Sequence, residues 1–213
     1  MENISEIYER YEVMPQLRDH QLRVAAVASR TIDAFEGSLD GEVIVNACLI
    51  HDMGNILKFD LSYFPEFVEP QGLAYWEEVK RRTAERYQTN DENVATRKIA
   101  EELGLSKAIL DCLEGIGFSR IERVLDDPSF GKKICCYADQ RVGPLGVVTI
   151  EERLTEGKKR YERHPDSLDH AARLADGLRA LERQLFAQVR ITPADISDAS
   201  IAQYWGSLVE REL

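Results

Sequence analysis

The stretch GEVIVNACLIHDMG, residues 41–54, joins an apolar run to an imidazole and a carboxylate. Its apolar residues recur at helical spacing and place His51 on the same stripe, so the imidazole of a helix capped by Asp40 faces a core. Burial in such surroundings would raise the pKa of an unpaired carboxyl group until it took up a proton. Asp52 therefore needs a bound partner to stay charged. His51 beside Asp52 is a ready pair of ligands for a divalent metal, but the dipeptide is too common to establish a site alone.

The overall composition is that of one folded domain. The chain has 213 residues and is 44% hydrophobic, which suffices for one sizeable core. Its net charge of −11 repels a phosphate backbone, so we expect no nucleic-acid partner. The four cysteines form no C-x-x-C pair, which favours buried thiols in a reducing compartment. We find neither a leader nor an apolar run of about 20 residues, so we expect a cytoplasmic protein with no membrane partner.

The hydrophobic periodicity is helical along almost the whole chain, and no segment predicts a strand. Besides the run that follows Asp40, helices are expected over residues 15–35, 73–87, 92–103, 107–113, 130–142, 151–163 and 168–189. The sequence thus predicts an all-α bundle over residues 1–165. A helical C-terminal extension, residues 166–213, is expected to pack on this bundle, and its leucine stripe is either core or a homodimer seam.

Two further polar residues lie on apolar helical faces far from the dyad. His20 faces inward on the helix that begins at Pro15, and Asp139 faces inward within YADQRV. Together with His51 and Asp52 they would balance the charge of one divalent cation and leave two octahedral positions open. This nitrogen and oxygen ligand set without thiolate suits Mn, Fe, Co, Ni or Mg better than a closed structural zinc site.

The order of these residues resembles the H…HD…D signature of the HD-domain metal-dependent phosphohydrolases. The segments HQLRVA at residues 20–25, LIHDMGN at 49–55 and YADQRV at 137–142 carry the likeness, which covers roughly residues 15–165. The resemblance implies an HD-type helical fold with a metal site and hydrolysis of phosphate esters. Members that hold two metals carry extra histidines between the dyad and the last aspartate. This chain has none there, so one ion is expected.

The same resemblance suggests roles for individual side chains. Asp52 and Asp139 would ligate the metal, and either could also accept a proton from the attacking water. Arg23 and Lys58 are candidate phosphate contacts, although a solvated helix face explains each equally well. Asn55 would orient the substrate or merely cap a turn. The irregular segment 55–71 is expected to form a loop over a pocket.

Two classes of function remain open from the sequence. The favoured one is a phosphohydrolase that acts on a small phosphorylated substrate, with a nucleotide as the first candidate. The other is a catalytically weak module that binds metal and ligand in signalling. All four candidate metal ligands are present, which favours the hydrolase. The role of Arg23 and Lys58 as phosphate contacts is open, so the binding module remains the alternative.

Overall fold

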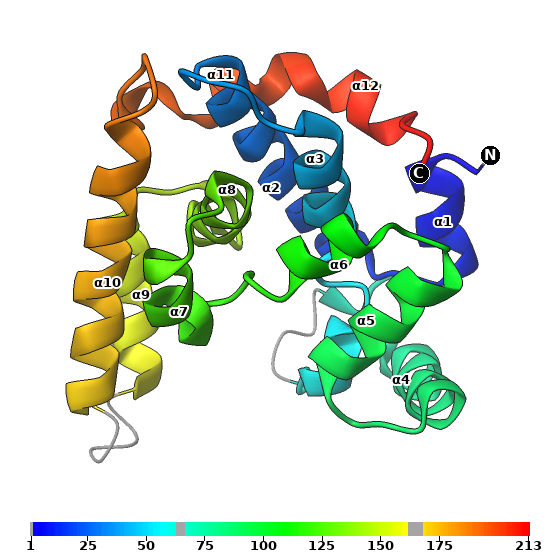
Figure 1. Cartoon of the computed structure of the whole chain (residues 1–213). Helices are drawn as coiled ribbons and strands as arrows, with labels where there is room; N and C mark the ends of the chain where they lie inside the picture. Colours follow the sequence, from blue (N-terminus) through cyan, green and yellow to red (C-terminus); the bar gives the residue numbers. More distant parts are fainter. Residues whose placement is uncertain (1, 63–66, 162–167) are drawn as a thin grey trace.

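The computed structural model describes residues 2–62, 67–161 and 168–213, and nearly every element is a helix (Figure 1). The first half forms α1 (Ile4–Arg10), α2 (Pro15–Asp33), α3 (Gly41–Ile50), η1 (Asn55–Lys58), α4 (Leu73–Tyr87), α5 (Glu92–Glu102) and α6 (Lys107–Leu113). The second half forms η3 (Phe118–Arg120), α7 (Ile121–Asp126), α8 (Phe130–Gln140), β1 (Val142–Gly143), β2 (Gly146–Val147), α9 (Ile150–Tyr161), α10 (Leu168–Phe186), η5 (Pro193–Asp195), α11 (Asp198–Ile201), η6 (Ala202–Tyr204) and α12 (Trp205–Val209). The predicted all-α class is confirmed.

Local sequence signals explain where the helices begin. Pro15 occupies the first turn of α2, where its missing N–H costs nothing. The Asp40 side chain accepts the N–H of Val43 at 3.1 Å and caps α3. Ser106 caps α6 in the same way. Pro15 and Asp40 thus set the starts of α2 and α3, the helices that position His20 and His51.

The expectation of no strand was wrong in one place. The helix predicted to run to residue 142 ends at Gln140, and a two-stranded antiparallel hairpin follows, in which Val142 pairs with Val147. Pro144 accounts for the break, because it has no N–H for a helix and biases the residue before it toward extended backbone. The α8 helix therefore ends one residue after Asp139.

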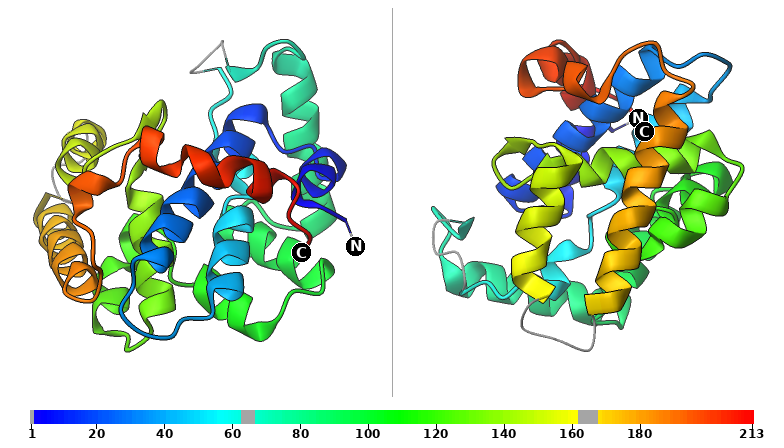
Figure 2. Two further views of the ribbon diagram at one scale, coloured as in Figure 1. Left: turned by 90° about the horizontal axis from the view of Figure 1, so that it is seen from above. Right: turned by 90° about the vertical axis from the view of Figure 1, so that its left-hand side faces the viewer.

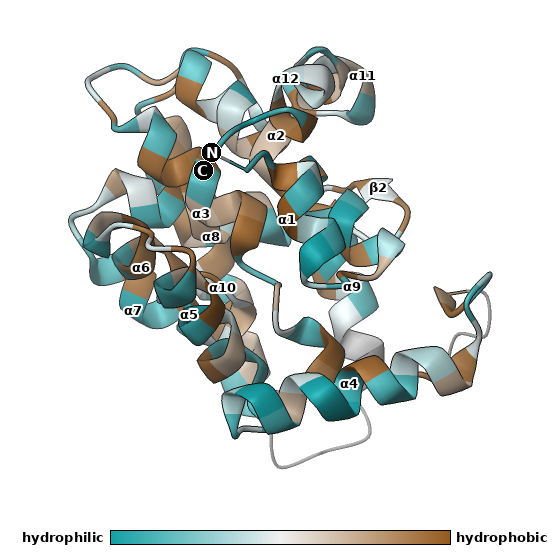
Figure 3. Ribbon diagram, turned by 90° about the vertical axis from the view of Figure 1, so that its right-hand side faces the viewer, coloured by the Kyte–Doolittle hydropathy of each residue, from teal (hydrophilic) through white to brown (hydrophobic). Residues whose placement is uncertain are grey.

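The centre of the molecule is formed by α2, α3 and α8, each of which packs against the other two. In Figure 3 the hydrophobic colour gathers on α3 and α8, while much of α4 is hydrophilic.

Figure 1 shows α9 and α10 at one end of the molecule and α4 and α5 at the other. All four cysteines are free and buried. No helix in the described ranges is both long and apolar enough to cross a bilayer.

The C-terminal helices complete the same core. The predicted leucine stripe of α10 is buried, which confirms the core reading of these side chains: Leu174, Leu178, Leu181 and Leu185. The chain ends lie side by side (Figure 2), and the N–H of Ile4 donates to the carbonyl of Arg211 at 2.8 Å. The predicted domain boundary at residues 165 and 166 lies outside the described residues, so that division stays a prediction.

A buried arginine at the end of α8 fastens the C-terminal segment. Arg141 is 2% exposed, and its guanidinium donates to the carbonyls of Pro193 at 3.1 Å and Ile196 at 3.0 Å. It also donates to the carbonyl of Val148 and to the hydroxyl of Tyr137. One side chain thus bonds α8, the hairpin and the segment before α11.

We expect Arg141→Met to lower the free energy of unfolding by about 2 kcal/mol, because it leaves several buried oxygens without a donor. Urea unfolding monitored by circular dichroism measures the change. Arg190→Met is the control, since this exposed side chain gives a single bond to a carbonyl, that of Asp33. Equal stability of the two variants would contradict the role assigned to Arg141.

Candidate metal centre

Three helices bring the candidate ligands to one place. His20 lies in the second turn of α2, His51 is the C-terminal cap of α3 with Asp52 next to it, and Asp139 lies in the last turn of α8. The His51 side chain is only 2% exposed, whereas those of His20, Asp52 and Asp139 are 20%, 18% and 13% exposed. The group therefore has a buried base and a side that remains accessible.

The distances join both imidazoles to both carboxylates. His20 Nε2 lies 3.5 Å from Asp52 Oδ2 and 3.3 Å from Asp139 Oδ1. His51 Nε2 lies 3.6 and 3.5 Å from the same two oxygens. Ligand atoms of His20, His51 and Asp52 all lie within 4.8 Å of one another. These three residues could hold a metal ion, and Asp139 contacts the group through the two imidazoles.

These spacings fit ligands of a cation better than hydrogen-bonded partners. Ligands about 2.1 Å from a metal are about 3.0 Å apart at right angles and about 3.4 Å apart in a tetrahedron. The observed gaps of 3.3 to 3.6 Å exceed the usual length of an N–H···O hydrogen bond. His51 Nε2 is also a buried atom that has no hydrogen-bond partner among the described residues. A cation would satisfy this nitrogen.

The electrostatics of the group attract positive charge. Burial disfavours the imidazolium of His51, but Asp52 and Asp139 outweigh burial and raise its pKa to about 9. Burial likewise opposes ionisation of Asp139, yet His20 and His51 hold the pKa of its carboxyl well below the usual range. The carboxylates and the buried imidazole of His51 thus form a group that could hold a cation.

Residues behind the centre fix the ligands, and the sequence prediction missed them. His51 Nδ1 donates to the carbonyl of Cys48 at 2.8 Å, which turns Nε2 toward the carboxylates. Gln140 Nε2 donates to Asp139 Oδ2 at 2.6 Å, and Gln21 Oε1 accepts the N–H of Asp52 at 3.1 Å. Both glutamines are buried and each directly follows a predicted ligand. An amide side chain on an apolar helix face was therefore the sequence signal that could have identified them.

We expect Gln140→Leu to weaken Mn²⁺ binding by about 10- to 100-fold, because Asp139 loses the bond that orients its carboxylate. Isothermal titration calorimetry gives the affinity, and thermal unfolding tests whether the variant is folded. Gln188→Leu makes the same chemical change at an exposed position of the chain and should bind as the wild type does. An unchanged Mn²⁺ affinity in Gln140→Leu would show that Gln140 does not position Asp139.

The three predicted substrate contacts are placed differently from the ligands. Arg23 Nε lies 3.2 Å from Asp198 Oδ1, and its guanidinium lies over the ring of Trp205. Lys58 is half-exposed, and its Nζ lies 3.9 Å from Glu92 Oε1. Each of these two basic side chains thus has a carboxylate neighbour outside the metal centre.

Asn55 and the segment after it form more regular structure than expected. Asn55 is buried, and its N–H donates to the carbonyl of Asp52 at 3.0 Å. Residues 55–58 form η1 where a loop was predicted, and η1 packs on α4 and α5. Residues 63–66 of the predicted pocket loop lie outside the described residues.

Of the two remaining histidines, only His170 lies among the described residues, and it stands apart from the centre. His164 lies outside the described residues. His170 is exposed on α10, where its ring nitrogen lies 3.4 Å from Arg173. The described part of the chain therefore offers His20 and His51 as the imidazoles of the site.

No protein-family model matches this sequence, and no curated protein and no solved structure matches it. The HD-type resemblance therefore rests on the motifs and stays a prediction.

Proposed function

We propose that this chain is a metal-dependent phosphohydrolase of the HD type that acts on a small phosphorylated substrate, with nucleotides as the first class to test. The observation that supports it most is the meeting of His20, His51, Asp52 and Asp139 from three helices around an unpartnered buried imidazole nitrogen. A divalent cation held there would supply a Lewis acid for a phosphoryl oxygen and for an attacking water.

The two carboxylates are suited to different tasks in this proposal. Asp139 presents Oδ1 to the imidazoles while Oδ2 accepts the amide of Gln140, so both of its oxygens are engaged. Asp52 presents Oδ2 to the same imidazoles, which leaves Oδ1 to accept a proton from water. Asp52 is therefore the better candidate for the general base, a distinction that the sequence left open.

The proposal is tested on the wild-type chain. Metal content after growth with Mn²⁺, Fe²⁺, Co²⁺ or Ni²⁺ should approach one ion per chain, and the loaded protein should release phosphate or a nucleoside from a panel of nucleoside mono-, di- and triphosphates. Chelation should stop turnover, and readdition of the metal should restore it. A chain that holds no ion under any of these conditions would contradict the proposal.

One observation favours the alternative of a catalytically weak metal-binding module. Phosphoryl transfer needs cationic groups at the equatorial oxygens, and the two candidates, Arg23 and Lys58, are both near carboxylates, those of Asp198 and Glu92. Stoichiometric metal without turnover on any nucleotide, sugar phosphate or aryl phosphate would select the module.

A further inference from the structure

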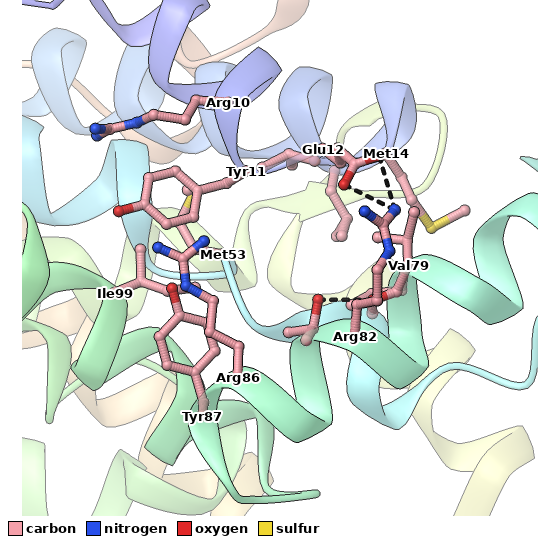
Figure 4. Close-up of a pocket in the computed structure, with 14 residues that line it drawn as sticks. Arg10, Tyr11, Glu12, Met14, Met53, Val79, Arg82, Arg86, Tyr87 and Ile99 are labelled. Atoms are coloured by element: carbon pink, nitrogen blue, oxygen red, sulfur yellow. Dashed lines mark hydrogen bonds and ion pairs between the residues drawn. The ribbon is translucent and has the colours of Figure 1, made fainter.

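A cavity of about 250 Å³ lies between the end of α1, the start of α2, α4 and the turn that follows the dyad (Figure 4). Its lining includes Met53, the neighbour of Asp52, and Leu17, one turn before His20. None of the four candidate metal ligands lines it. The cavity is therefore a separate site that shares its supporting segments with the metal centre.

The floor of the cavity is apolar. It is lined by these side chains: Val13, Met14, Leu17, Met53, Ile56, Val79 and Ile99. The volume falls below the range of about 300–1,000 Å³ that is usual for ligand pockets, so the space suits one small ring better than a whole nucleotide. Shape and floor thus indicate a compact ligand with an apolar body.

Basic side chains, here called the basic wall, also line the cavity, in a protein that is acidic overall. Three arginines and one glutamate line the cavity, whereas the whole chain carries a net charge of −11. Figure 4 shows the guanidinium of Arg86 between the rings of Tyr11 and Tyr87, and its carbon lies 5.5 and 5.4 Å from the two ring centres. Stacking holds this cation in a fixed orientation at the wall.

The two arginines of α4 that line the cavity form ion pairs at the surface. Arg82 lies 2.9 Å from Glu12 and Arg86 contacts Glu102, and the four side chains are between 34% and 53% exposed. Exposed pairs of this kind contribute at most about 1 kcal/mol, so an anion with good geometry can compete for them.

We propose that this cavity binds a small organic anion in which one aromatic or aliphatic ring carries a carboxylate or phosphate. The ring lies on the apolar floor beside Met53 and Val79, and the anionic group faces Arg82 and Arg86. The inference is independent of the proposed hydrolase activity.

The test uses four probes on the wild-type chain: benzoate, phenyl phosphate, benzyl alcohol and inorganic phosphate. Two-dimensional NMR titrations should show the two ring anions binding tighter than the other two by about tenfold, with shifted amides in residues 10–14 and 79–87. Benzoate and phenyl phosphate also distinguish a carboxylate ligand from a phosphate ligand.

Matched variants of α4 test the assignment. Arg82→Gln should weaken binding of the ring anions by about tenfold, whereas Arg81→Gln should not, because Arg81 also pairs with Glu78 but does not line the cavity. Thr83→Phe should fill the space and abolish binding. The proposal is overturned by equal binding of benzyl alcohol, by equal binding of inorganic phosphate, or by binding that survives Thr83→Phe.

Discussion

The Asp52→Asn chain is expected to lose the proposed metal binding and the proposed hydrolytic activity together. The amide keeps the shape of the carboxylate but removes the charge that faces both imidazoles at 3.5 and 3.6 Å. Mn²⁺ affinity should fall by at least about 100-fold, since changes to residues behind a ligand already cost 10- to 100-fold. Phosphate release should fall by about 1,000-fold or more, because the same residue is the candidate proton acceptor. Calorimetric titration and a phosphate-release assay measure the two effects.

Asp19→Asn provides the matched control for this variant. Asp19 precedes His20 on α2, but its side chain is exposed and takes no part in the group. The control should keep the metal affinity and the activity of the wild type. Full metal binding with full turnover in Asp52→Asn would contradict both roles proposed for Asp52, whereas full metal binding with lost turnover would leave Asp52 the proton acceptor alone.

Gly54→Ala is expected to destabilise the fold by about 3 kcal/mol or more. A Cβ at this position would lie 2.4 Å from the carbonyl oxygen of Glu92 and 2.9 Å from the backbone nitrogen of Thr96, and backbone cannot move aside as a flexible side chain can. The φ of Gly54 is −92°, which alanine adopts without strain, so the cost is purely steric. For a domain of this size the melting temperature should drop by about 6–12 °C.

Gly157→Ala is the control because a Cβ at that position of α9 meets nothing within 4 Å. Alanine in a helix interior should stabilise the chain by about 0.5–1 kcal/mol. Gly54 also donates its N–H to Thr96 Oγ1 at 2.9 Å, so the variant moves the turn that carries Asp52. Reduced metal affinity should therefore accompany the loss of stability. A melting temperature equal to that of the wild type would contradict the prediction, because it would show that the backbone of α5 can shift to make room for the Cβ.

The bundle and most of its helix limits could be predicted from local signals. The helices at residues 73–87 and 107–113 have the predicted bounds, and Thr149 and Glu152, three residues apart, form a capping box before α9. These features depend on neighbouring residues in the chain, so the sequence contains them directly. The hairpin after Gln140 escaped prediction because its strands are only two residues long and carry no alternating pattern.

What remained beyond the sequence were contacts between distant segments. Arg23 was a plausible phosphate contact from its place one turn after His20, but its partner Asp198 lies 175 positions further along the chain. The bond from the N–H of Asp52 to Gln21 Oε1 likewise joins the turn after α3 to α2, and no spacing rule indicates it.

The sequence by itself determined that this protein is helical, where its main helices begin, and that His20, His51 and Asp139 face the interior, because periodicity and caps act over a few residues. Only the tertiary structure decided that both imidazoles lie within 3.6 Å of the same two carboxylate oxygens and that the candidate cations lie beside other acids. Such distances follow from how α2, α3 and α8 pack, and packing depends on the fit of all their side chains together.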